Sequence, residues 1–180
     1  MGSRVISWHG AAAALALAVM CAGMTCRGTD GAGAASAVDG DPAAMWAFRF
    51  ERLGGGTLTL SELPSKVVIV CFFTTWADAG ILQAKALSNL FERESGRGLG
   101  VVGVAMDLEK DASVGPFVRQ FKIAFPVVFA DEAVLKGTSP FGNISTVPAS
   151  YIFDGEGRLL GVWTGVMPAK ELESLMERHL

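Results

Sequence analysis

The stretch VVIVCFFTTWADAG, residues 67–80, decides the fold expected for this chain. It begins with a continuous apolar run rich in β-branched residues, which is typical of a central strand buried on both faces. The run ends at Thr74-Thr75-Trp76, where we expect a turn. From Asp78 onward apolar side chains recur at helical spacing. The stretch therefore predicts a strand, a turn and a helix in succession.

Strands and helices alternate on either side of this stretch. The patterns predict strands at 45–53, 57–60, 66–73, 99–107, 125–131, 149–154 and 158–165, and helices at 78–95, 113–123, 131–137 and 168–180. The tetrapeptide Asp154-Gly155-Glu156-Gly157 between the last two strands indicates a hairpin. This order predicts an α/β fold, with a mixed central β-sheet sandwiched by helices and with extra N-terminal strands.

Composition excludes several classes of function. The chain has 180 residues, enough for one domain with a core, and a net charge of −3 without a basic cluster. We therefore expect no nucleic-acid partner, because phosphate binding needs a concentrated basic face. Three cysteines and two histidines provide neither a disulfide framework nor a Cys/His metal site, so we expect no metal and no other cofactor.

The first 26 residues have the features of a targeting segment. Arg4 supplies a positive start, and no formal charge occurs from Val5 to Cys26. The Ala-rich run at 10–24 is typical of a signal peptide, although the segment is long enough to remain as a membrane anchor. Residues 27–44 are rich in Gly, Ala, Ser and Asp, which predicts a flexible tether. Residues 45–180 are expected to form the folded domain.

Three outcomes for the targeting segment remain open. Ala35-Ser36-Ala37 fits the small-x-small pattern that signal peptidase cleaves. Alternatively, Cys26, or less well Cys21, is the lipidated cysteine of a bacterial lipoprotein, although Thr25 stands where Gly, Ala or Ser is usual. The third outcome is an uncleaved anchor. All three export the remaining chain, so we expect a periplasmic or cell-envelope location, with membrane association through the N-terminus in the last two.

Several motifs together carry a family resemblance. They are LTLSELPSKVVIVCFFTTWADAG at 58–80, VVGV at 101–104 with Asp107, FKIAFPV at 121–127, and Thr146-Val147-Pro148 followed by YIFD at 151–154. In this order they resemble the TlpA/ResA-like branch of the thioredoxin family, a group of redoxin or AhpC/TSA-like proteins. The resemblance covers residues 45–180 and implies a thioredoxin fold displayed outside the cytoplasm, with thiol–disulfide exchange as the activity of the family.

The resemblance fails where the family performs its chemistry. Aligned on Trp76, the two cysteines of the family motif fall on Ala77 and Gly80. In such a motif the first cysteine is a thiolate stabilised by a helix N-terminus, and the second resolves the mixed disulfide. Ala77 has no nucleophile and Gly80 has no resolving thiol. We therefore assign no catalytic residue at this turn.

Two nearby residues, Cys71 and Asp78, are poor substitutes for the missing thiols. Cys71 lies inside the apolar strand, where a buried thiol has a raised pKa and behaves as an inert core residue. Asp78 is expected in the first turn of the helix, where it favours the helix dipole. A lone carboxylate without a histidine, a metal or a second acid is a poor catalyst.

The resemblance also implies a binding groove, formed by Trp76, Asp78, Val147 and Pro148. Pro148 matches the cis-proline of the family, and the backbone before it pairs there with an extended peptide, a form of strand addition. Purely structural roles remain open for Trp76 and Pro148. Trp76 could cover the core, and the fold could require a cis bond before Pro148.

Three hypotheses for function follow. The first is a non-catalytic partner- or peptide-binding module in an extracytoplasmic redox or protein-maturation context, whose protein client is unidentified. The second is a thiol–disulfide oxidoreductase or peroxiredoxin-like antioxidant enzyme that uses Cys71 or a thiol of a partner. The third, supported by the tether alone, is a stalk-like structural lipoprotein.

Overall fold

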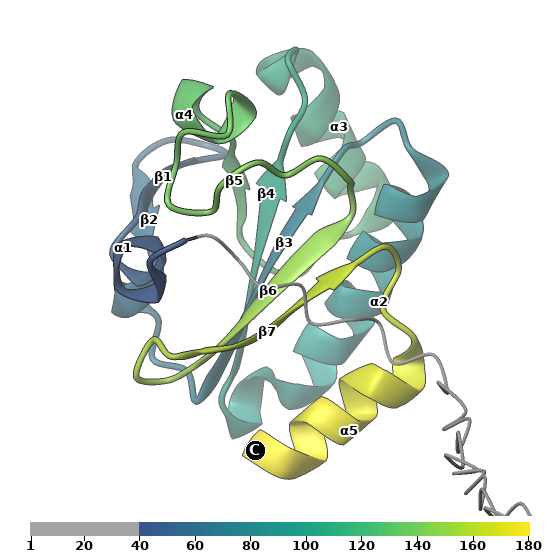
Figure 1. Cartoon of the computed structure of the whole chain (residues 1–180). Helices are drawn as coiled ribbons and strands as arrows, with labels where there is room; N and C mark the ends of the chain where they lie inside the picture. The colour runs from purple at the N-terminus through teal and green to yellow at the C-terminus, as the bar shows by residue number, and fades with distance from the viewer. Residues whose placement is uncertain (1–39) are drawn as a thin grey trace, which may run out of the picture. The chain divides into compact units, whose positions relative to one another are not determined.

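A single mixed sheet of seven strands forms the centre of the described part of the chain (Figure 1). The computed structural model describes residues 40–180, so the expected signal segment, Cys26 and the tether up to residue 39 lie outside it. The strands are β1 (Arg49–Arg52), β2 (Thr57–Thr59), β3 (Val67–Phe73), β4 (Leu99–Ala105), β5 (Val127–Phe129), β6 (Ala149–Asp154) and β7 (Leu159–Thr164). Their order in the sheet is β2-β1-β5-β4-β3-β6-β7. Strands β3, β4 and β5 are parallel, and the other neighbours pair antiparallel.

Helices cover both faces of this sheet. One face packs against α2 (Asp78–Glu94), α3 (Lys110–Phe121) and α5 (Ala169–His179), and the other against α1 (Pro42–Trp46) and α4 (Glu132–Leu135). Single 3-10 turns span Leu60–Glu62 and Ser95–Arg97. Between residues 40 and 180 no helix is long and apolar enough to cross a membrane. The expected α/β sandwich is therefore confirmed, and it has a thioredoxin-like arrangement.

The central strand explains why the sheet has a core on each side. All seven residues of β3 are buried, and successive side chains point to opposite faces. Ile69, Cys71 and Phe73 belong to the core beneath α2, α3 and α5, whereas Val70 and Phe72 belong to the core on the α1 and α4 side. The unbroken apolar run at the centre of the sequence is thus the signature of a strand covered on both faces.

The strand expected to begin at Met45 is corrected by the structure. Met45 and Trp46 end the short helix α1, which also includes residues 42–44 at the end of the range assigned to the tether, and β1 begins only at Arg49. The helix forms because the Asp41 side chain accepts a hydrogen bond of 3.0 Å from the Ala43 N–H and a proline occupies the first turn. This local cap outweighs the alternation of aromatic residues that suggested a strand.

Candidate functional site

Three chain segments meet at one edge of the sheet, where β3 and β4 end and β6 begins. Residues 74–77 follow β3 and residues 106–109 follow β4, its parallel neighbour. The antiparallel pairing of β3 with β6 ends at Phe72 and Ala149, so Val147 and Pro148 leave the sheet beside the turn after β3. The fold therefore brings the expected groove segments, the turn at 74–78 and Val147-Pro148, to one edge.

The helix after the turn begins at the position that the family resemblance assigns to the first cysteine. Ala77 is the N-cap of α2, with extended backbone and no side-chain cap, and Asp78 lies in the first turn as expected. The first intrahelical bond runs from the Ile81 N–H to the Ala77 carbonyl, 3.0 Å away. The preceding N–H groups, from Asp78 to Gly80, have no intrahelical partner. The backbone at Ala77 is thus suited to hold an anion, but the side chain has no thiol.

The position assigned to the second cysteine is closed by the backbone. Gly80 is buried in the first turn of α2. A Cβ atom at Gly80 would lie 2.5 Å from the carbonyl oxygen of Thr74, closer than real Cβ contacts allow. A cysteine at this position therefore requires the turn or the helix to move.

The turn is held by a carboxylate whose role the sequence did not indicate. Asp107, a landmark of the resemblance, is 5% exposed. Its Oδ1 accepts a 2.6 Å bond from the Thr75 hydroxyl, and its two oxygens lie 3.2 and 3.1 Å from the Thr75 N–H. In the sequence, the only indication of this role was an acidic residue close to the end of a predicted buried strand. The bonds join the turn after β3 to the end of β4.

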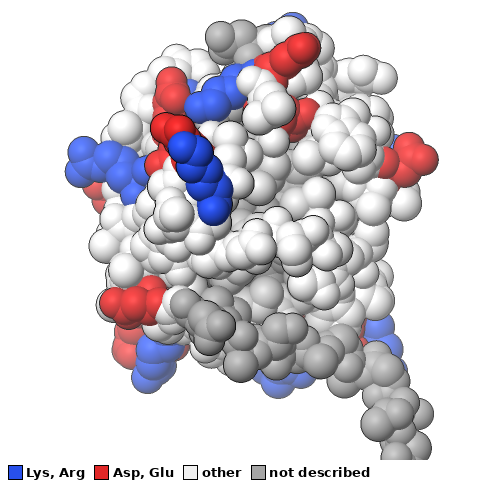
Figure 2. All heavy atoms as spheres, turned by 45° about the horizontal axis from the view of Figure 1, so that its top comes forward, with Lys and Arg blue, Asp and Glu red and all other residues white. Residues whose placement is uncertain are grey.

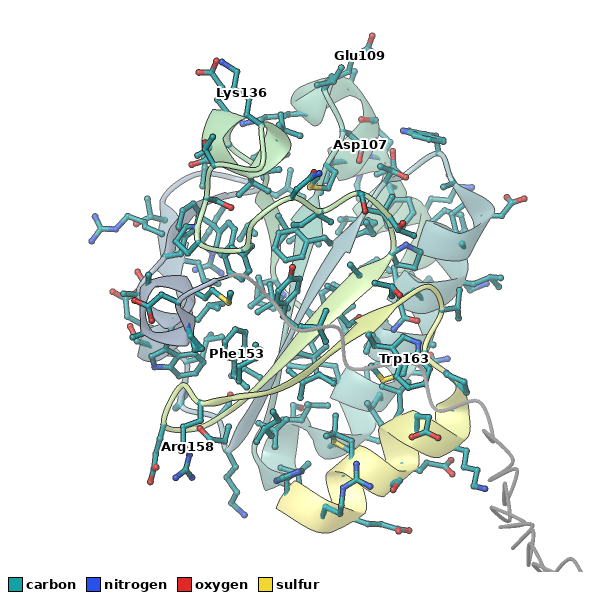
Figure 3. The ribbon with its side chains drawn as sticks, viewed as in Figure 1. Asp107, Glu109, Lys136, Phe153, Arg158 and Trp163 are labelled. Atoms are coloured by element: carbon teal, nitrogen blue, oxygen red, sulfur yellow. The ribbon has the colours of Figure 1, made fainter. Side chains whose placement is uncertain are left out.

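A cavity of about 560 Å³ lies between these two segments. Its walls include Trp76 and Leu108, which are 76% and 85% exposed. Glu109 also lines the cavity and projects outward at the start of α3, whereas Asp107 lies inside the edge (Figure 3). Within residues 40–180 no group of three or more His, Cys, Asp or Glu side chains could hold a metal ion. The site is an apolar surface around a cavity with acidic walls.

Val147 and Pro148 form the neighbouring rim. Their peptide bond is cis, as the resemblance implies. The Pro148 carbonyl accepts a 2.7 Å bond from the Gly165 N–H, whereas the Val147 N–H and carbonyl make no hydrogen bond to another described residue. Val147 therefore offers a free donor and acceptor just before the start of β6, next to the turn that carries Trp76.

Cys71 is the only cysteine among the described residues, and it is buried as expected. Its side chain is 1% exposed, and it lies opposite Ser150 of β6. Burial raises the pKa of the Cys71 thiol to about 12. At neutral pH the thiolate fraction is then on the order of 10⁻⁵, so this thiol is a poor nucleophile.

A buried glutamine near the turn was missed by the sequence reasoning. Gln83 lies one turn after Gly80 and is completely buried, and its Oε1 accepts a 2.7 Å bond from the Met167 N–H. This bond ties α2 to the loop between β7 and α5. The only signal for it was a polar residue on the apolar face of α2.

The thioredoxin-like architecture and the edge just described agree with the comparison to protein families. The model of the AhpC/TSA family matches residues 40–161. The chain belongs to the AhpC/TSA family. The match covers the sheet from β1 into β7 together with the turn after β3, so the resemblance to redoxins seen in the sequence is confirmed.

Related proteins carry names from thiol–disulfide chemistry. The thiol-disulfide oxidoreductase ResA of Bacillus subtilis is 27% identical over 130 residues, which are 72% of this chain and 70% of ResA. ResA of Bacillus cereus is 26% identical over 128 residues, 70% of each chain. The thioredoxin-like protein YneN of Bacillus subtilis is 26% identical over 132 residues, 72% of this chain and 75% of YneN.

Solved structures share the fold. A thiol:disulfide interchange protein of the thioredoxin family from Chlorobium tepidum superposes with a TM-score of 0.65 at 22% identity, over 78% of this chain and 98% of that one. A secreted disulfide oxidoreductase of Mycobacterium tuberculosis gives a TM-score of 0.61 at 19% identity, over 74% and 97%. At these identities the likeness concerns the fold alone.

Proposed function

We propose that this chain is an exported, membrane-tethered thioredoxin-like domain that has lost thiol–disulfide chemistry and binds an extended segment of a protein partner. One observation carries the proposal. The edge where the family performs its chemistry keeps an exposed Trp76 and a free Val147 backbone, whereas the only described thiol, Cys71, is buried in the sheet.

The loss of chemistry follows from what exchange requires. Thiol–disulfide exchange needs an accessible thiolate and a second thiol to resolve the mixed disulfide. The positions matched to these thiols are Ala77 and Gly80, and a side chain at Gly80 would meet the Thr74 carbonyl. The packing around Gly80 thus agrees with a site that no longer accommodates a cysteine.

The binding function follows from the same edge. An extended peptide can pair with the unpartnered N–H and carbonyl of Val147, in the segment that precedes β6 and lies outside the sheet. The large exposed face of Trp76 then supplies an anchor, because aromatic side chains dominate the energetics of peptide and protein interfaces. Asp78, exposed in the first turn of α2, borders this groove. The context we infer is extracytoplasmic redox chemistry or protein maturation, in which this chain holds a client and does not oxidise it.

Two observations support export and tethering: the pattern of the N-terminal segment and the description of a structural relative. Residues 1–26 have the pattern of a signal peptide or anchor, with Cys26 as the candidate for lipidation. A fold relative from Mycobacterium tuberculosis is described as secreted. Partition of the expressed full-length chain into detergent, compared with a Cys26→Ser variant, tests lipid anchoring: loss of partition in the variant identifies Cys26 as the lipidated residue.

The second candidate function is a thiol–disulfide oxidoreductase or peroxidase-like enzyme that uses Cys71 or a thiol of its partner. Membership of the AhpC/TSA family and the names of the relatives favour it. The use of Cys71 requires a rearrangement that exposes it, because a thiol that is 1% exposed cannot meet a substrate disulfide.

Two assays on the full-length chain in detergent decide between the candidates. The first measures reduction of insulin disulfides by the chain and by Cys71→Ala, beside a thioredoxin control. We expect both chains to be inactive; activity that disappears in Cys71→Ala would establish the enzyme instead.

The second assay measures binding of an S-alkylated insulin B chain, an extended polypeptide without free thiols, by fluorescence anisotropy. We expect Trp76→Ala to weaken binding about fivefold or more, as for an aromatic anchor. Leu160→Ala is the matched control, because Leu160 is an exposed apolar residue on β7 and does not line the edge. Equal binding by the unmodified chain, Trp76→Ala and Leu160→Ala would contradict the proposal that the peptide binds beside Trp76.

A further inference from the structure

The outer side of β7 is an unpaired strand at one end of the sheet, where β7 pairs only with β6. Such strands present free backbone donors and acceptors, and proteins usually shield them with charged residues, prolines, bulges or very short length. The strand at the other end, β2, has only three residues. β7 has six, and no charged residue or proline occurs from Leu159 to Met167, so its only shield is a bulge where its register with β6 shifts. β7 is therefore suited to pair with a further strand.

A groove separates β7 from α5, which runs beneath it in the view of Figure 1. Its volume is about 410 Å³. Residues 160–163 of β7 line one side, and α5 contributes Glu171, Leu175, Arg178 and His179 to the other. The spacing of Glu171, Leu175 and Arg178 places these three side chains in one stripe along the helix. A strand added to β7 would bring its own protein against this stripe.

The two charges at the ends of the stripe have no partner of opposite charge in the described part of the chain. Neither Glu171 nor Arg178 forms an ion pair there, although an Arg178 nitrogen donates to the Ser174 hydroxyl. Elsewhere acidic and basic side chains lie side by side, as Lys136 and Glu132 do, and Figure 2 shows such neighbours around the margin of the molecule. The stripe thus presents one acid and one base, about two helical turns apart, for pairing with another molecule.

We propose that β7 pairs with β7 of a second copy of this chain, antiparallel and about a two-fold axis. The axis turns the stripe on α5 end for end, so Glu171 of each protomer faces Arg178 of its partner. Leu175, between the two charges, then lies close to the axis in both protomers. A parallel pairing would instead place like charges opposite each other. The antiparallel dimer joins the two sheets into one continuous sheet and pairs all four charges of the two stripes.

The partner is a second copy because the surface is complementary to itself. Main-chain pairing along β7 would accept a strand from many proteins, but the order of acid, apolar residue and base on α5 matches its own reversed copy. An uncharged strand and a stripe with one charge of each sign also leave no net repulsion between identical protomers. The pairing involves neither Trp76 nor Val147, so it is independent of the peptide binding proposed above.

The test compares charge reversals in the full-length chain. Sedimentation equilibrium in a detergent matched to the solvent density measures the dissociation constant of the dimer. We expect Glu171→Arg and Arg178→Glu each to raise this constant about tenfold or more, because like charges then face each other at both ends of the interface. The matched control is Glu173→Arg, which reverses an exposed acid on α5 that does not line the groove and should leave the constant unchanged.

A mixture of the two variants provides a sharper test. When Glu171→Arg is mixed with Arg178→Glu, the introduced arginine faces the introduced glutamate at one end of the interface. At the other end the native Arg178 faces the native Glu171. We therefore expect the mixture to form dimers at concentrations at which each variant alone is monomeric. A folding defect in either variant would not be repaired by mixing, and circular dichroism confirms that both are folded.

Each outcome decides the proposal. Dimers that form on mixing, together with an unaffected Glu173→Arg control, support the pairing of β7 and α5 between two copies. An unmodified chain that remains monomeric at all concentrations overturns it. Dimers that Glu171→Arg and Arg178→Glu leave as stable as before also overturn it, because the contact then lies elsewhere in the chain. A mixture that stays monomeric overturns the antiparallel arrangement.

Discussion

The carbonyl oxygen of Thr74 lies 2.5 Å from the place where a side chain at Gly80 would begin. Gly80 is in the first turn of α2 and Thr74 is the first residue after β3, so this contact sets how closely the helix approaches the sheet. The position matched to the second cysteine of the family is therefore occupied by backbone.

Substitution Gly80→Ala should destabilise the protein, although alanine is the better helix former. The added methyl group meets a backbone atom that cannot rotate away, and forced overpacking of this kind costs about 1–3 kcal/mol. Urea unfolding of the full-length chain in detergent measures the change. Gly115→Ala in α3 is the matched control, because its Cβ would meet only the tip of Arg119 at 3.4 Å. We expect Gly115→Ala to stabilise the protein by up to about 1 kcal/mol. If Gly80→Ala is as stable as the unmodified protein, the Thr74 carbonyl does not exclude a side chain at position 80.

A cysteine at position 77 should be accepted and reactive. Ala77 is partly exposed at the uncapped start of a 17-residue helix, so a thiolate there is stabilised by the helix dipole. We expect Ala77→Cys to have a thiol pKa below the ordinary value of about 8.5. The rate of iodoacetamide alkylation against pH measures it, in a chain whose Cys21 and Cys26 are replaced by alanine. The control is Glu173→Cys on the exposed face of α5, and equal pKa values for the two thiols would show that this helix start offers no such stabilisation.

The buried Cys71 should make stability fall at alkaline pH. Its pKa rises from the ordinary value of a cysteine to about 12 in the folded protein, because burial disfavours the thiolate. Above pH 9 the unfolded state therefore binds fewer protons than the folded state, and the free energy of unfolding decreases as pH rises. Between about pH 8 and pH 10 this group alone contributes a loss of about 1 kcal/mol.

The contribution of Cys71 is measured by comparing the free energy of unfolding of the unmodified protein and of Cys71→Ala at these two pH values. We expect the variant to be less stable at both, because it leaves a small cavity, but to lose about 1 kcal/mol less between them. Native-state labelling with a thiol reagent should leave Cys71 unmodified until denaturant is added. Rapid labelling without denaturant would show that Cys71 is accessible in the folded protein and would favour the enzyme hypothesis.

Gln83 should hold the loop that carries Met167 against α2. In Gln83→Met the 2.7 Å bond is lost and the Met167 N–H is left buried without an acceptor, which costs about 1–3 kcal/mol. Hydrogen exchange at the Met167 amide should accelerate more than the global loss of stability explains. Gln→Met at exposed Gln120 in α3 is the control and should change neither quantity. Unchanged exchange at Met167 would mean that the loop is held by other contacts.

Local patterns predicted most of the fold. The apolar runs at β3 and β4 indicated strands covered on both faces, and the Asp-Gly-Glu-Gly segment correctly placed a hairpin between β6 and β7. The start of α2 at Asp78 was also correct. These features depend on neighbouring residues, so they can be predicted without knowledge of the whole chain. The strand expected at Met45 was wrong for a local reason too, because the Asp41 cap stabilises a short helix there.

The site was less predictable because it is built from distant segments. Thr75 and Asp107 are 32 residues apart, and Gln83 and Met167 are 84 apart. No spacing rule links such pairs. Asp107 could be recognised as a landmark, but its bonds to Thr75 and its place in a cavity required the parallel pairing of β3 with β4.

By itself, the sequence determined the succession of strand, turn and helix around Trp76 and the absence of a thiol at positions 77 and 80, because hydrophobic periodicity and residue identity are properties of the chain. Tertiary structure alone decided that Gly80 rests on the Thr74 carbonyl and that Asp107 is buried beside a cavity without a described cationic partner. Close contacts and desolvation arise only when the ends of neighbouring strands are brought together, and the function of this edge depends on both.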